Sequence, residues 1–146
     1  MSTPPILNGQ VIGQAHYATR ALLERALAPL GVSFGQSVAL NALAQGATER
    51  TRLVQRMTGA LKVDESIVHE AIAGLVDAGL AQVDDATAQV SLTETGRATQ
   101  ARIGAAIAAI TARLYADIPT DEMSSAARVL TLVTQRANAE LAAAPA

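Results

Sequence analysis

The chain has 146 residues, a formal net charge of −2 and no cysteine. That length suits one domain, or one compact unit with an added dimerisation part, and the absence of cysteine excludes disulfides, thiolate metal sites and a cysteine nucleophile. The net charge gives no global attraction to nucleic acid, so any DNA binding has to come from a local patch of positive charge.

The composition favours helices with thin cores. Half of the residues are hydrophobic, but only Tyr17, Phe34 and Tyr115 are aromatic and thirty-two residues are alanine. Alanine favours helix and buries little area, so the protein gains from burying surface against a second copy. No apolar run approaches the roughly 20 residues that span a bilayer, and the N-terminus lacks the features of a signal peptide. We therefore expect a cytoplasmic protein with no membrane partner.

Apolar spacing and cap residues predict the elements in chain order. The expected helices cover about 9–29, 34–45, 52–61, 65–78, 96–116 and 121–143, and two short strands cover 81–83 and 88–92. Gly31 and Gly79 are the expected residues after two helix ends, and Ser33, Asp64 and Thr120 are expected N-caps. Thr93 or Thr95 caps the fifth helix. Residues 46–51 are expected to form a polar turn.

The segment 62–97 is the most informative part of the chain. It predicts an amphipathic helix, a glycine stop, a hairpin and the start of a further helix. The apolar face of that amphipathic helix is expected to be Ile67, Val68, Ala71, Ile72, Leu75 and Ala78. This order is the second half of a winged helix-turn-helix, which places one helix in the DNA major groove and a hairpin beside it. Between Lys62 and Arg97, however, there are seven acidic residues and no Lys or Arg. The topology indicates a DNA reader, whereas the local charge opposes phosphate.

Apolar stripes mark the helices at both ends of the chain. They predict a helical dimerisation region, with the block 34–92 as the functional module. The expected fold class is mainly α with a short β-hairpin wing.

Three runs of residues resemble the MarR (multiple antibiotic resistance regulator) family of winged helix-turn-helix regulators. They are Leu30–Leu43, Leu75-Val-Asp-Ala-Gly-Leu80 and Val90-Ser-Leu-Thr-Glu-Thr-Gly-Arg97, and the resemblance follows almost the whole chain in order and length. It implies one domain over 1–146, with a DNA-binding lobe over 32–93 and helical dimerisation segments over 6–31 and 94–144. It also implies a homodimer on a palindromic operator in double-stranded DNA, and a small aromatic or phenolic effector.

The sequence departs from the family's pattern at two positions in this lobe. The family's wing usually carries an arginine after an aspartate, whereas the turn here is Asp84-Asp85-Ala86-Thr87. Near the end of the recognition helix, where the family often has arginine, this chain has Gly74, which costs a helix about 1 kcal/mol relative to alanine.

Positive charge gathers just before the recognition helix. Phosphate contacts position a protein on DNA, and side chains on the outward helix face read base edges. The candidate DNA-binding residues are Arg50, Arg52, Arg56, Lys62, Ser66 and His69. The alternative is that the arginines form an ordinary solvated helix surface.

A second group of polar residues lies in the region that lines the effector cavity in the family. The candidate ligand-binding residues are His16, Arg20, Ser37 and Asn41. The alternative is a polar helix edge in which Arg20 pairs with Glu24 at i, i+4.

Catalysis and metal binding have little support in the sequence. The two histidines are fifty-three residues apart and the glycines form no phosphate loop. We expect no enzyme, no cofactor and no metal, but a ligand-responsive repressor. One alternative is a relative of this fold that has lost DNA binding and serves as a small-ligand or protein-interaction dimer. An enzyme that uses the effector cavity is the other.

Overall fold

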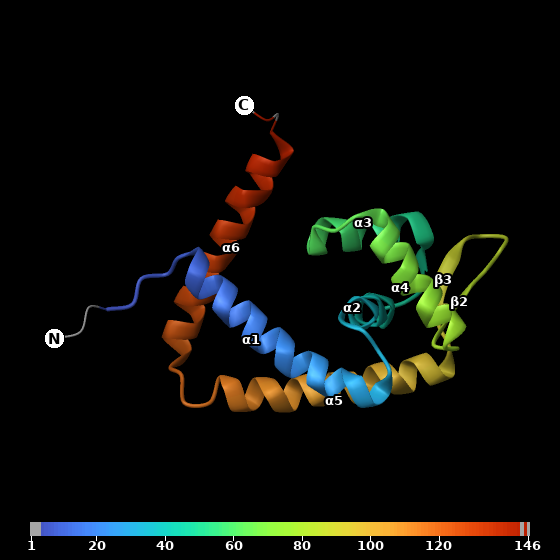
Figure 1. Ribbon diagram of the computed structural model, residues 1–146, viewed down its shortest axis with the longest axis horizontal. Helices are drawn as coiled ribbons and strands as arrows, with labels where there is room; N and C mark the ends of the chain where they lie inside the picture. The colour runs from blue at the N-terminus through green and yellow to red at the C-terminus, as the bar shows by residue number, and fades with distance from the viewer. Residues whose placement is uncertain (1–3, 144, 146) are drawn as a thin grey trace. The chain divides into compact units, whose positions relative to one another are not determined.

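The computed structural model describes residues 4–143 and 145 (Figure 1). The elements are α1 (Gly9–Leu27), the 3₁₀ turn η1 (Ala28–Leu30), α2 (Phe34–Leu43), β1 (Thr48–Glu49), α3 (Arg50–Leu61), α4 (Glu65–Asp77), β2 (Ala81–Val83), β3 (Gln89–Leu92), α5 (Glu94–Leu114) and α6 (Thr120–Ala142). The chain is mainly helical with a small antiparallel sheet, which confirms the predicted fold class. It divides into two compact units, one up to Ile110 and one from Thr111 onward, which are described separately.

The predicted start of α2 at Ser33 is confirmed by its hydrogen bonds, whereas its end differs from the prediction, because α2 ends at Leu43 rather than at residue 45. The Ser33 hydroxyl accepts from the Gln36 backbone N–H at 3.1 Å, and the Gln36 side-chain oxygen accepts from the Ser33 N–H at 3.0 Å. This reciprocal pair is a capping box, which satisfies two donors at the helix start. Gly31, just before it, has φ +68°, the left-handed conformation that glycine adopts without strain.

The predicted stop of α4 at Gly79 is also confirmed. Gly79 has φ +76°, its N–H donates to the Val76 carbonyl at 3.0 Å, and the Leu80 N–H donates to the Leu75 carbonyl at 2.9 Å. These two bonds define a Schellman motif, which satisfies the last carbonyls of a helix. Leu80 is buried and leads directly into β2.

The sheet has three strands in the order β1-β3-β2, and β1 was missed by the sequence analysis. Thr48 pairs with Val90 and Glu49 with Gln89, so part of the expected polar turn 46–51 is a strand. A strand of two residues carries no readable alternation, and its partner is about forty residues away. The helix α3 then begins at Arg50, two residues earlier than predicted, and the Arg50 N–H donates to the Ala88 carbonyl at 2.9 Å. Ala88 itself has φ +59° and lies outside β3.

The core of the first unit lies between α2, α3, α4 and the sheet. Its largest fully buried side chains are Leu27, Leu40, Leu53, Met57, Val68, Ile72, Leu75 and Val90. Two residues expected on the buried face of α4 are exposed: Ile67, at 50% exposure, and Ala78. Each lies beside the buried stripe of α4 rather than within it, so the buried face of α4 is narrower than the sequence pattern suggested.

The junction between β3 and α5 rests on Thr93 and Gly96. The Thr93 hydroxyl accepts from the Gly96 N–H at 3.0 Å and donates to the Gly79 carbonyl at 2.6 Å. Thr93, rather than Thr95, is therefore the cap of α5.

The second unit contains α6, which has no buried residue among those described. Its N-cap is Pro119, and Thr120 is its first helical residue, so the prediction that Thr120 caps this helix was wrong. Proline with φ near −58° suits the entry to a helix without any side-chain bond.

Among the described residues, no single helix combines the length and hydropathy needed to cross a membrane. Together, Gly9–Leu30 and Phe34–Leu43 reach that composition, but across a bend of 81°.

Candidate nucleic-acid interface and ligand pocket

The helices α3 and α4 form a helix-turn-helix pair joined by Lys62, Val63 and Asp64. Lys62 closes α3 with φ +58°, and its N–H donates to the Thr58 carbonyl at 2.9 Å. The link is therefore short and fixed by backbone geometry, which sets the start of α4 close to the end of α3.

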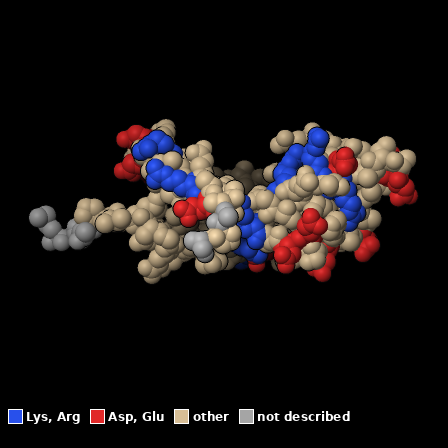
Figure 2. Space-filling view, turned by 90° about the horizontal axis from the view of Figure 1, so that it is seen from above, with Lys and Arg blue, Asp and Glu red and all other residues tan. Residues whose placement is uncertain are grey.

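Positive side chains line the exposed side of α3. Arg52 and Arg56 are exposed one helical turn apart, and Lys62 is exposed at the helix end. Figure 2 shows basic side chains close together on the molecular surface, with acidic side chains near them. Two exposed guanidinium groups at this spacing are able to reach neighbouring phosphates, whereas the acidic surroundings limit their attraction.

Arg50 behaves differently from the other two arginines, because it contacts His69 on α4. Its Nε lies 3.3 Å and its Nη2 lies 3.2 Å from His69 Nδ1, and both residues are partly buried. They line a shallow pocket of about 140 Å³ between α3 and α4, together with Thr51, Val54, Gln55 and Glu65. Sequence reasoning proposed both residues as DNA contacts, but it missed their contact, which joins positions nineteen residues apart.

The outward face of α4 is confirmed in part. Ser66 is exposed as expected, together with Glu70 and Ala73, whereas His69 is only partly exposed. Ile67 adds a large apolar side chain to this exposed surface, a feature that the sequence analysis placed in the core.

The wing turn is held by Asp84. Its side-chain oxygen accepts from the Ala86 N–H at 2.9 Å and its carbonyl accepts from the Ala88 N–H at 2.7 Å. Asp84 therefore has the turn role that its residue type favours. This turn contains no Lys or Arg that could reach a minor groove.

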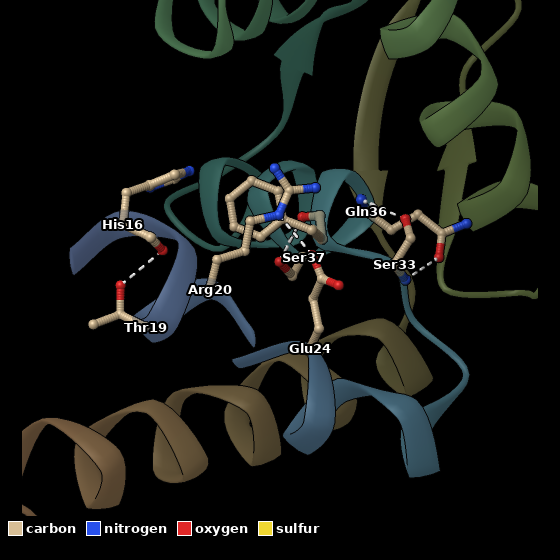
Figure 3. Close-up of polar contacts among 8 residues, drawn as sticks. His16, Thr19, Arg20, Glu24, Ser33, Gln36 and Ser37 are labelled. Carbon is tan, nitrogen blue, oxygen red and sulfur yellow. Dashed lines mark hydrogen bonds and ion pairs between the residues drawn. The ribbon is translucent and has the colours of Figure 1, made fainter. Parts of the chain in front are cut away.

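The second candidate site is a pocket of about 380 Å³ between the end of α1 and the start of α2. Its lining residues are Arg20, Glu24, Ala28, Val32, Ser33, Phe34 and Gly35. The Arg20 guanidinium lies 4.2 Å above the centre of the Phe34 ring, and its Nε donates to Glu24 at 2.6 Å (Figure 3). The expected Arg20–Glu24 pair is thus confirmed, and Phe34 is a pocket residue that the sequence analysis did not identify.

The other predicted ligand residues do not line this pocket. His16 packs edge-on against Tyr17, with ring centres 5.6 Å apart. Ser37 is buried and donates to the Phe34 carbonyl at 2.6 Å, while Asn41 is exposed. Of the four candidates, the structure brings only Arg20 to the pocket.

No group of three or more His, Asp or Glu side chains able to hold a metal ion occurs in the part of the chain that the structure describes.

No protein-family model matches the sequence, and no curated protein matches it. Solved structures do match along the chain. The DNA complex of the Mycobacterium tuberculosis MarR family protein Rv2887 is 22% identical, covers 88% of this chain and 98% of its own, and has a TM-score of 0.68. This chain has the MarR fold.

Two further structures with the MarR fold match over similar lengths. Reduced MarR from E. coli is 20% identical, covers 89% of this chain and 95% of its own, and has a TM-score of 0.69. CouR from Rhodococcus jostii RHA1, bound to p-coumaroyl-CoA, is 16% identical, covers 86% of this chain and 90% of its own, and has a TM-score of 0.74. Rv2887 has also been solved with salicylic acid.

Proposed function

We propose that this chain is a DNA-binding transcriptional regulator that acts as a homodimer on a palindromic operator. The observation that carries the proposal is the helix-turn-helix pair α3–α4 with Arg52 and Arg56 exposed along α3. The DNA complex of Rv2887, a protein with the same fold, supports it.

The charges assign different tasks to the two helices. Arg52, Arg56 and Lys62 contact phosphates and position the protein. Ser66 and His69 on α4 read base edges in the major groove. Glu65 and Glu70 lie on the same helix and repel phosphate, so we expect weak binding, with a salt dependence set by the few phosphate contacts.

The dimer follows from apolar side chains that lack cover within one chain. Residues 32–93 act as the DNA-binding lobe, and the helical segments 6–31 and 94–144 hold two copies together. Two lobes related by a twofold axis meet half-sites one helical turn apart, roughly 34 Å.

A small aromatic effector releases the repressor from its operator. The pocket beside Arg20 and Phe34 combines a cation with an aromatic ring, which suits a carboxylate-bearing ring. Two proteins of this fold were solved with salicylic acid and p-coumaroyl-CoA, which supports this ligand class. A coupling of about 1–3 kcal/mol between effector and DNA is enough for regulation.

The test is a mobility-shift titration of the protein at several salt concentrations, on its own upstream region and on duplexes selected from a random library. Changing Arg52 and Arg56 together to alanine weakens binding to all duplexes about equally. Each lost phosphate contact makes the negative slope of log K against log salt less steep by roughly 0.9. The matched control changes Arg128 and Arg136 on α6, which removes the same charge elsewhere, and retains the slope.

A rival function is a dimer that binds ligands or proteins but not DNA. The seven acidic residues between Lys62 and Arg97 favour this rival. Absence of any sequence-dependent shift at micromolar protein and low salt would favour this rival over the regulator.

A further inference from the structure

The contact between Arg50 and His69 determines which ring nitrogen of His69 carries the proton. A guanidinium group has five N–H donors and no acceptor. Both Nε and Nη2 of Arg50 lie within hydrogen-bond distance of Nδ1 of His69. Nδ1 must therefore be the acceptor, and the proton of the neutral imidazole is on Nε2.

The surroundings leave that Nε2–H available for a ligand. His69 is partly buried on α4 and lines the pocket between α3 and α4, which opens to solvent. Within the described part of the chain, the imidazole ring of His69 has hydrogen bonds only through Nδ1. Arg50 and Glu65 are the charged groups that line the same pocket, and α3 also presents Thr51 and Gln55 there.

The backbone of Arg50 is fixed as well. Its N–H donates to the Ala88 carbonyl of the wing turn at 2.9 Å, at the point where β1 passes into α3. The Arg50 side chain therefore starts from a fixed backbone position close to the sheet. Because its two nitrogens already face the imidazole, it is less available for phosphate than the exposed Arg52 and Arg56.

We propose that Arg50 is a positioning residue, which acts through His69 and not on phosphate. By holding His69 in one tautomer, it presents an Nε2–H donor to the N7 atom of a purine in the major groove. This inference rests on the proposed DNA binding and goes beyond it. It names purine N7 as the atom that His69 contacts, and Arg50 as the residue that orients His69 for that contact.

The first test measures the tautomer in the free protein. Long-range proton–nitrogen NMR spectra at mildly alkaline pH distinguish a protonated ring nitrogen from a bare one, and a His16→Gln variant assigns the signals, since the chain has two histidines. The proposal predicts only Nε2–H in the parent protein and detectable Nδ1–H in Arg50→Ala. Detectable Nδ1–H in the parent, or no change in Arg50→Ala, would overturn it. This measurement needs no DNA, so it stands even if the proposed function fails.

The second test uses a selected duplex in which each purine is replaced, one at a time, by its 7-deaza analogue. One replacement weakens binding of the parent by roughly 5-fold or more, the range of a single base contact. In His69→Ala that replacement has no effect, in Arg50→Ala its effect is smaller than in the parent, and the double variant behaves as His69→Ala does.

The matched control is Arg52→Ala, which weakens binding to all duplexes but keeps the parent's loss of affinity with that analogue. Equal sensitivity of the parent, His69→Ala and Arg50→Ala to every analogue would overturn the proposal. So would a fall in the salt slope of Arg50→Ala equal to that of Arg52→Ala, because it would mark Arg50 as a phosphate contact.

Discussion

Lys62 combines a charge and a backbone conformation that favour different residues. It closes α3 at φ +58°, a region in which a residue with a Cβ is strained by roughly 1–2 kcal/mol. Glycine would adopt this conformation freely, but it would remove a positive charge from the turn before the recognition helix.

Two substitutions at Lys62 separate charge from backbone strain. Lys62→Gly and Lys62→Ala both remove the charge, so both weaken binding to every duplex by a similar factor. Lys62→Gly is expected to be more stable than Lys62→Ala by about 1 kcal/mol, because only glycine relieves the positive φ. Urea unfolding measures the stability difference, and salt titrations measure the charge effect. Equal stabilities would show that this turn relaxes without strain.

Gly74 shows what a residue type alone does not reveal. The sequence marks it as a cost of about 1 kcal/mol inside a helix. In the structure a Cβ at Gly74 would overlap the side-chain amide of Gln36, the residue that completes the capping box of α2. The glycine lets α4 approach the start of α2 closely. Helix propensity is local and readable from sequence, whereas the identity of the packing neighbour is not.

The wing turn owes its shape to one of its two aspartates. Asp84 accepts from the Ala86 N–H, whereas Asp85 is exposed and contributes charge. Asparagine retains the acceptor oxygen of aspartate, so a change of both residues to asparagine removes two negative charges and keeps the turn.

We expect Asp84→Asn with Asp85→Asn to strengthen DNA binding several-fold at low salt, with a smaller gain at high salt because the effect is screened. Fluorescence anisotropy on labelled duplex measures both values. The control is Asp84→Ala with Asp85→Asn, which removes the same charges but also the turn hydrogen bond. Unchanged affinity in both variants would place the wing away from the phosphate backbone.

The junction between wing and α5 gives a physical reason for the Leu-Thr-x-x-Gly-Arg run at Leu92–Arg97. Thr93 bonds at once to Gly79 and Gly96, and a Cβ at Gly96 would overlap the backbone carbonyl of Leu80. Backbone atoms cannot rotate away as a side chain does, so the glycine is required for the close approach of α5 to the exit of α4.

Gly96→Ala is therefore expected to lower the free energy of unfolding by about 1–3 kcal/mol or more, as in other overpacked sites. The matched control is Gly59→Ala, an exposed glycine inside α3 whose added Cβ would meet nothing. That control gains up to about 1 kcal/mol from helix propensity. Chemical unfolding of both variants gives the comparison, and a neutral Gly96→Ala would mean that α5 shifts without cost.

The elements differ in how far the sequence specified them. The start of α2 and the stop of α4 were predictable, because Ser33 and Gly79 act through bonds to neighbours within five residues. β1 was not predictable, because Thr48 and Glu49 become a strand only by pairing with Val90 and Gln89. The Arg50–His69 contact has the same origin. Each residue was identified as a candidate by type, but their interaction depends on how α3 packs on α4.

At the scale of the whole molecule, the exposed apolar side chains need an explanation. Val11 on α1, Ile107 and Leu114 on α5, and Leu130 and Val133 on α6 are all more than a third exposed. Isolated exposed apolar residues are ordinary, but repeated ones at helical spacing mark a surface that binds another surface. A second copy of the chain supplies such a surface in the proposed dimer.

Leu130 and Val133 allow a direct test, because they are 39% and 43% exposed on a helix with no buried residue among those described. Changing both to aspartate removes apolar contact at four positions of a dimer. At about 1 kcal/mol for each position, Kd for dimerisation rises roughly 1000-fold. Sedimentation across a range of concentrations measures this change.

The control is Ser125→Asp, which adds charge to an exposed polar position of the same helix and leaves the dimer intact. Binding to a full operator depends on the dimer, because a monomer presents only one recognition helix to one half-site. The Leu130→Asp, Val133→Asp variant is therefore expected to bind a full operator no more tightly than a single half-site. If it stays dimeric, α6 lies outside the interface. If it is monomeric and still prefers the full operator, half-site pairing does not depend on the dimer, and the palindromic arrangement proposed here is wrong.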